Sequence, residues 1–161
     1  MEINLPDGSS KKLEPGSNGL DLAKSIGSRL AKSAVAVLVD DEQRDLLDEL
    51  PDKASVSIIT IESEEGLQIM RHTLTAQVLA KAVKNLYADS KLAIGPTIEN
   101  GFYYDVSTKT PISIEDLPRI ENEMIRILEK KSNIIKTLHS EKDAKKLFKE
   151  IGPTTFFNIF W

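Results

Sequence analysis

Apolar side chains recur at three- and four-residue steps between residues 67 and 86, the spacing of one buried stripe along an α-helix. No glycine or proline interrupts the chain between Gly66 and Gly95, so the pattern predicts a helix of about five or six turns. The helix is predicted to begin at Ser63 or Glu64, where acidic residues of the first turn suit the helix dipole. His72 lies near the stripe and is expected to face other protein more than open water.

The pattern after this helix predicts a mixture of short strands and amphipathic helices. Strands are expected at residues 91–94 and 101–105, joined by Gly-Pro and Glu-Asn-Gly turns. An amphipathic helix is predicted from Ser113, a strand at 133–138, and a last helix capped by Ser140.

The first 62 residues predict a separate small domain. Their order is a β-hairpin around a Pro-Asp-Gly turn, a short helix, a buried strand, a small crossing element and a last strand. The predicted elements are strands at 2–5 and 11–13, a helix capped by Ser17 or Asn18 and ended by Gly27, a strand at 34–39, an acidic turn at 40–42, a crossing element with Leu46, Leu47 and Leu50, and a strand at 56–61. This order predicts a mixed sheet wrapped over one helix, the β-grasp (ubiquitin-like) arrangement. Such a fold suits docking or RNA contact, an interpretation by analogy of fold.

Composition narrows the class of protein. The 161 residues are 40% hydrophobic and 29% charged, as in a globular protein, and contain no cysteine, which excludes disulfides and thiolate metal sites. No apolar run approaches the roughly 20 residues of a membrane span, and the N-terminus does not resemble a signal peptide. The net charge is −4, so a nucleic acid would have to be bound by a local basic patch.

Several stretches together resemble a known family. They are PDGS in the first hairpin, LAKS after the first helix, then EGLQIMRH, LAKAVKNLY and LAIGPTIENGFYYD, in this order. The order resembles the N-terminal region of bacterial-type threonyl-tRNA synthetases, over residues 1 to about 150. The resemblance implies that residues 1–62 are a TGS domain. It implies that residues 63–161 are the first part of the editing domain, which removes serine wrongly attached to threonine tRNA.

The long helix departs from the family at its second histidine. The family has His-x-x-x-His there, whereas this chain has His72 and, five positions later, Gln77. Five residues of a regular α-helix rotate by about 500°, which leaves the two side chains about 140° apart. A π-bulge could absorb the extra residue and restore a shared face. Glutamine nevertheless cannot act as a general base and is a poor metal ligand.

The end of the chain is the second departure. The family continues with further editing residues, including a cysteine and a histidine, and then with the ATP- and zinc-binding aminoacylation core, none of which this chain shows. The chain is therefore expected to be truncated, and no cofactor or metal site is expected in it. Its last residues hold Phe156, Phe157, Phe160 and Trp161, which are either filler for an incomplete core or an exposed patch that seeks a protein partner.

Other candidate residues keep two interpretations each. His72 is either a relic of ester hydrolysis or a packed helix histidine, and His139 is expected to be exposed and structural. Tyr103 and Tyr104 either line a nucleotide pocket or pack on a sheet face. The hairpin lysines, Lys11 and Lys12, either contact tRNA phosphate or are simply solvated.

The sequence thus predicts an α+β protein in which a β-grasp TGS-like domain, residues 1–62, precedes a partial editing-type domain, residues 63–161. We expect a cytoplasmic, membrane-free relative of threonine–tRNA ligase that lacks the ligase core and binds threonine tRNA or a protein. Editing of seryl-tRNA is expected to be vestigial or absent. The alternative is a stand-alone seryl-tRNA deacylase, so the sequence leaves open whether the chain is an enzyme.

Overall fold

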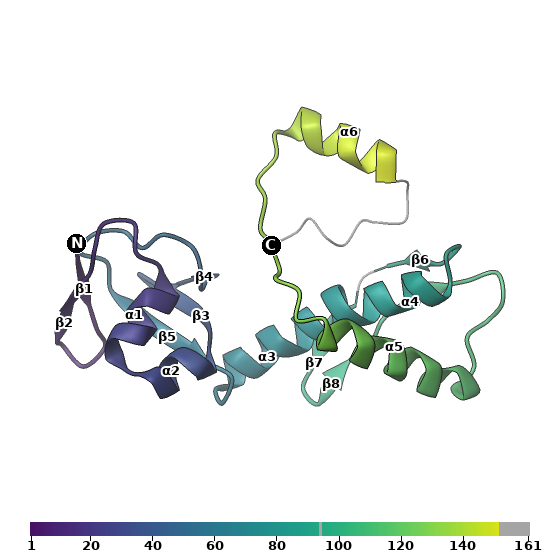
Figure 1. The fold of residues 1–161 in the computed structure, drawn as a ribbon, viewed down its shortest axis with the longest axis horizontal. Helices are drawn as coiled ribbons and strands as arrows, with labels where there is room; N and C mark the ends of the chain where they lie inside the picture. The colour runs from purple at the N-terminus through teal and green to yellow at the C-terminus, as the bar shows by residue number, and fades with distance from the viewer. Residues whose placement is uncertain (94, 152–161) are drawn as a thin grey trace. The chain divides into compact units, whose positions relative to one another are not determined.

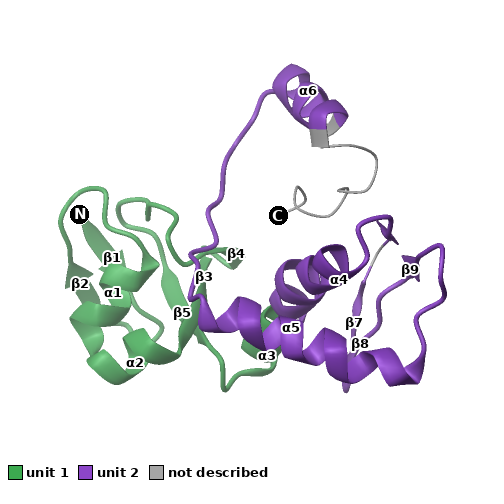
Figure 2. Ribbon diagram, turned by 45° about the vertical axis from the view of Figure 1, so that its right-hand side comes forward, with its two compact units in different colours: residues 1–70 green, residues 71–161 purple. Residues whose placement is uncertain are grey.

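The computed structural model of the protein describes residues 1–93 and 95–151. It divides into two compact units, Met1–Met70 and Arg71–Trp161 (Figure 2). The division falls inside the long helix whose start the sequence places at Ser63 or Glu64, so the border at residue 62 stays a prediction. No helix within the described ranges is long and apolar enough to cross a membrane.

Unit 1 is a mixed sheet with two helices (Figure 1). Its elements are β1 (Glu2–Asn4), β2 (Ser10–Lys12), α1 (Gly19–Ile26), α2 (Ser28–Ser33), β3 (Ala34–Val39), β4 (Glu42–Asp45) and β5 (Val56–Thr60). β1 pairs with β2, and β3 pairs with both β4 and β5, all antiparallel. A parallel bridge between Asn4 and Ser55 places the hairpin beside β5, so the strands follow one another as β2-β1-β5-β3-β4. This is the expected β-grasp arrangement.

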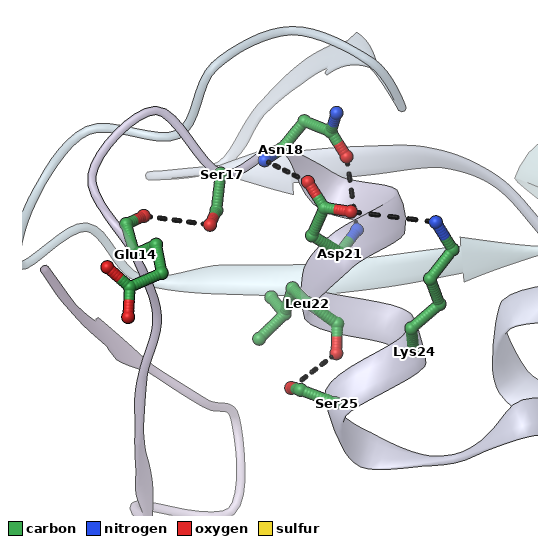
Figure 3. A network of polar contacts seen from close by, with 7 residues as sticks. All are labelled: Glu14, Ser17, Asn18, Asp21, Leu22, Lys24 and Ser25. Carbon is green, nitrogen blue, oxygen red and sulfur yellow. Dashed lines mark hydrogen bonds and ion pairs between the residues drawn. The ribbon is translucent and has the colours of Figure 1, made fainter.

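Helix α1 is fixed at both ends by residues that the sequence singles out. The Asn18 side chain accepts a hydrogen bond from the Asp21 backbone N–H at 3.0 Å, and the Asp21 carboxylate accepts one from the Asn18 N–H (Figure 3). Gly27 follows the last turn. One face of α1 then packs on the sheet, with Leu22 fully buried beside Val37 in the core of the unit. The buried residues of this core cluster are Ile3, Leu22, Val37, Val39, Leu50, Ala54 and Val56.

The stretch after β3 corrects the sequence prediction. Asp40 and Asp41 form the expected turn with positive φ, but the crossing element is preceded by a strand, β4, that no pattern indicated. Residues 42–45 read Glu-Gln-Arg-Asp and contain no apolar side chain, because β4 is an exposed edge strand with only one neighbour. Helix α2 was also not predicted.

Unit 2 is built on the predicted long helix, which begins in unit 1. This helix consists of α3 (Glu64–Thr73), a π-helical segment η1 (Leu74–Leu79) and α4 (Ala80–Leu86). The backbone N–H of Ala80 donates to the carbonyl of Thr75, five residues earlier, which is the hydrogen bond of a π-helix. The π-bulge that the sequence left as a hypothesis is thus present.

Short strands and two further helices complete the described part of unit 2. They are β6 (Lys91–Leu92), β7 (Thr97–Ile98), β8 (Gly101–Phe102), β9 (Val106–Ser107), the 3-10 turn η2 (Ile114–Asp116), α5 (Leu117–Glu129) and α6 (Glu141–Ile151). β6 pairs with β9, and β7 forms a hairpin with β8. The cap expected at Ser140 is present, and Ser113, where a helix was expected to begin, precedes η2 and forms a capping box with Asp116.

Three strand predictions in unit 2 were wrong in detail. The strand expected at 91–94 is β6 alone in the described residues, and the one expected at 101–105 is only β8. Residues 133–138 form no strand at all, and Ile134, Ile135 and Leu138 are 61%, 81% and 85% exposed. The pattern of alternating apolar residues favoured a strand, but no neighbouring strand pairs with this segment, so nothing stabilises it.

The core of unit 2 lies between α4 and α5. Ala82, Val83 and Ile120 are buried there. Glu123, only 8% exposed, joins the two helices, because its carboxylate accepts hydrogen bonds from Asn85 Nδ2 at 2.7 Å and Arg126 Nη2 at 2.9 Å. Both hydrogen bonds and the ion pair with Arg126 lower the pKa of Glu123.

Candidate functional site

His72 lies in the last turn of α3 and is half-buried. Burial disfavours the charged imidazolium and lowers the pKa of His72 below its ordinary 6.5. The ring is therefore neutral at pH 7 and has one nitrogen that can accept a hydrogen bond or a proton.

Gln77 lies within the π-helical segment and is also half-buried. A π turn holds more residues than an α turn, so Gln77 is rotated less far from His72 than the roughly 140° of a regular α-helix. That the two side chains share a face stays a prediction.

The signature segment GPTIENGFYYD packs against this same stretch of helix. Arg71 Nη1 donates a 2.7 Å hydrogen bond to the carbonyl oxygen of Glu99, in the turn between β7 and β8. Gly95 is buried, and a Cβ atom on it would overlap the ring of Tyr104 and lie 2.8 Å from Thr75 Cγ2. The Thr75 hydroxyl donates to the Arg71 carbonyl at 2.7 Å and is fully buried. The helix and the segment 95–104 are therefore in contact at Arg71 and Thr75, which flank His72 in the sequence.

Tyr103 and Tyr104 lie together at an apolar groove of unit 2, whereas His72 and Gln77 are not among the residues that line it. Tyr103 is 53% exposed, and Tyr104 is half-buried, so burial raises the pKa of its phenol. The groove has a volume of about 680 Å³, and its lining includes Leu79, Val83, Phe102, Tyr104, Leu117 and Ile120.

The two hairpin lysines lie in unit 1, on β2. Lys12 is exposed and Lys11 is half-buried. β2 and β4 are the opposite edges of the sheet, and both views show them at opposite sides of unit 1 (Figures 1 and 2). The segment that contains β4 is acidic, because residues 40–49 carry six carboxylates and one arginine. Asp52 lies instead beside β1, where its carboxylate accepts a hydrogen bond from the Glu2 N–H.

The sequence pointed to His72, Gln77 and the two tyrosines but missed Arg71, Gly95 and Thr75. Arg71 acts through a hydrogen bond to a backbone carbonyl, and Gly95 acts through the close approach of its backbone to Thr75. Neither contact can be recognised from residue type or spacing. His139 is exposed, as expected. The aromatic residues 156–161 lie outside the described part of the chain. Within that part, no group of three His, Asp or Glu side chains is placed to hold a metal ion.

Comparison with protein families identifies the domain type of unit 1. Residues 1–60 match the family model of the TGS domain. Together with the strand order β2-β1-β5-β3-β4, this shows that the chain begins with a TGS domain of β-grasp type.

The chain as a whole is similar to particular synthetases. It is 42% identical to the threonine–tRNA ligase of Oceanobacillus iheyensis, 45% to that of Natranaerobius thermophilus and 43% to threonine–tRNA ligase 1 of Bacillus subtilis. Each alignment covers 94% of this chain and 23–24% of the relative. The chain thus resembles the N-terminal region of threonine–tRNA ligases, and it spans about a quarter of their length.

Proposed function

We propose that residues 1–161 are a tRNA-binding region of the threonine–tRNA ligase type, and that they bind threonine tRNA without hydrolysing its aminoacyl ester. The observation that supports this proposal is the π turn at Leu74–Leu79, which contains Gln77 and reduces its rotation away from His72. A glutamine amide can donate and accept hydrogen bonds to a ligand but cannot take a proton from water. The helix face is therefore suited to holding a polar ligand more than to cleaving it.

The charge distribution of the TGS domain supports an approach of RNA from the β2 edge. Four strand spacings of about 4.8 Å place β2 and β4 about 19 Å apart. This distance exceeds the Debye length of about 8 Å at physiological salt, so the carboxylates near β4 are screened from Lys11 and Lys12. Lys11 and Lys12 are therefore the cations offered to phosphate at the β2 edge, with the Glu2 carboxylate opposite Lys12 on β1.

Salt-dependent binding of threonine tRNA tests this proposal. Wild-type protein is expected to bind more weakly as salt rises, because phosphate contacts release counterions. The variant Lys11→Glu/Lys12→Glu should bind more weakly and reduce the slope of log K against log salt by about one per lysine. The matched variant Lys142→Glu/Lys146→Glu changes two exposed lysines of α6 by the same charge and should leave the slope unchanged. Absent or salt-independent binding would contradict the proposal.

A seryl-tRNA deacylase is the second candidate function, and the neutral state of His72 favours it. A neutral imidazole can accept a proton from water at pH 7. In this case His72 would be the base and Gln77 would only orient the substrate. Loss of deacylation in His72→Ala would support this function, and equal rates of deacylation in mutant and wild type would exclude it.

A further inference from the structure

The apolar groove of unit 2 is continuous with the core of that unit. Val83 and Ile120 are 2% and 6% exposed, belong to the buried cluster between α4 and α5, and also line the groove. Leu117, one turn before Ile120, lines the same groove and is 55% exposed. The core of unit 2 is therefore open on this side, and apolar side chains face solvent there.

The groove suits an aromatic, uncharged occupant. Every described residue that lines it is uncharged at neutral pH, and Phe102, Tyr103 and Tyr104 contribute aromatic rings. Its volume of about 680 Å³ lies within the range of about 300–1,000 Å³ of pockets that bury whole ligands. A charged segment would lose its hydration in such a groove without gaining a partner.

One segment of this chain has the matching chemistry. Residues 152–161 read GPTTFFNIFW, lie outside the described residues, and contain four aromatic side chains and no ionisable one. This is the longest stretch of the chain without a charged side chain, preceded directly by α6. Ten residues reach at most about 33–36 Å when extended. The segment belongs to the same chain as the open groove. Because it is covalently attached, its effective concentration at the groove is high.

We propose that residues 152–161 dock into this groove and complete the core of unit 2 with their aromatic side chains. The docked segment buries apolar surface of Leu117 and Phe102 that is otherwise in water, and its own aromatic rings leave water as well. The docking is intramolecular and does not depend on tRNA.

The single tryptophan of the chain, Trp161, reports on this docking directly. In the full-length chain, the fluorescence emission of Trp161 should lie at shorter wavelength than that of free tryptophan amide. Acrylamide should quench Trp161 several-fold less than it quenches the free amide. Leu117→Gln should move both values toward those of the free amide. The ratio of docked to undocked chains should fall by about tenfold or more, because burial of a leucine side chain is worth at least this factor.

Leu128→Gln is the matched control. Leu128 lies on the same helix, α5, is 53% exposed against 55% for Leu117, and does not line the groove. It should leave the emission and quenching of Trp161 unchanged. Circular dichroism of both variants shows whether each is folded, and removal of residues 152–161 provides a second measurement, since the open groove should then bind an apolar dye.

Three results would overturn the proposal. The first is Trp161 emission and quenching equal to the free amide in the full-length chain. The second is an equal response to Leu117→Gln and Leu128→Gln. The third is a blue shift that disappears on dilution together with a dimer in sedimentation, which would assign the groove to a second copy of the chain instead.

Discussion

At the scale of single residues, Gly95 connects the signature segment to the long helix. Its backbone passes so close to Tyr104 and Thr75 that any side chain would meet both. Tyr104 is the candidate ligand-contacting residue and Thr75 belongs to the π turn, so this contact fixes two parts of the site at once. The absence of a Cβ atom at this position therefore has a structural reason.

Replacement of Gly95 by alanine should destabilise the protein. The new methyl group would force Tyr104 and Thr75 apart, and overpacking of this kind costs roughly 1–3 kcal/mol of unfolding free energy. Urea unfolding followed by circular dichroism measures the loss. Gly101→Ala is the control, since a Cβ atom there has no neighbour within 4 Å. Equal stability of the two variants would show that the close contact at Gly95 is not formed.

Residue-scale predictions from the sequence succeeded where chemistry is local. The caps at Ser140 and at Asn18, the latter as one of two options with Ser17, were identified because a short polar side chain before an apolar run has few other roles. The bond from Arg71 to the Glu99 carbonyl was missed, because a backbone acceptor 28 residues away leaves no mark on residue type. The half-buried position of His72, which lowers its pKa, agrees with the prediction from its place near the apolar stripe.

At the scale of elements, the π-helical segment divides the long helix. The apolar residues from 67 to 86 follow the period of a regular α-helix, so a π turn between them rotates the first part of the stripe relative to α4. Leu67 and Met70, before the π turn, are 42% and 38% exposed, whereas Ala82 and Val83, after it, are buried. The sequence left the π turn as one of two options. The helical period alone does not reveal where the backbone hydrogen bonds change from four residues apart to five.

A metal probe tests the alignment of the two positions. In Gln77→His, histidines at 72 and 77 should chelate Ni²⁺ or Zn²⁺, as pairs one turn apart do in helical metal sites. Metal at about 100 times its dissociation constant should then raise the unfolding free energy by about 2.7 kcal/mol. The double variant His72→Ala/Gln77→His should show no such gain. Equal stabilisation of both variants would mean that the two side chains do not share a face.

The contact between α4 and α5 depends on the charge of Glu123. Its folded-state pKa is lowered, mainly by the hydrogen bond from Arg126, so its stabilising effect is present above the ordinary pKa of 4.5 and is lost as the pH falls through the folded value. Glu123→Gln should therefore lower stability at pH 7 and show a smaller further loss on acidification than wild type.

Chemical unfolding at neutral and acidic pH measures this difference. Glu121→Gln, an exposed carboxylate on the same helix, is the control and should follow wild type at both pH values. An acid response of Glu123→Gln identical to that of wild type would contradict the assigned role of Glu123.

The strands of unit 2 were the elements least accessible to prediction. β6, β7, β8 and β9 have two residues each, too short for a period of two to be recognised. At residues 133–138 a strand was predicted that the structure does not contain. A segment with the pattern of a strand does not form one unless a neighbouring strand pairs with it. The β-grasp unit was predicted better, because its hairpin and its buried strand 34–39 carry strong local signals.

At the scale of the whole molecule, the proposed tRNA binding assigns a separate role to each of the two units. Lys11 and Lys12 of the TGS domain would contact phosphate, and the helix that carries His72 and Gln77 in the second unit would hold a polar ligand. The resemblance to threonine–tRNA ligases was predictable, because the segment LAIGPTIENGFYYD is long and specific. The role of the chain follows less directly, since it spans about a quarter of those relatives.

The most direct test of the central claim is a single-turnover deacylation assay with seryl-tRNA for threonine, made at protein concentrations that saturate tRNA binding. We expect the bound seryl-tRNA to be hydrolysed no faster than the free one, and His72→Ala to leave this rate unchanged. Hydrolysis that is accelerated by the wild-type chain and lost in His72→Ala would contradict the claim and identify the chain as a deacylase.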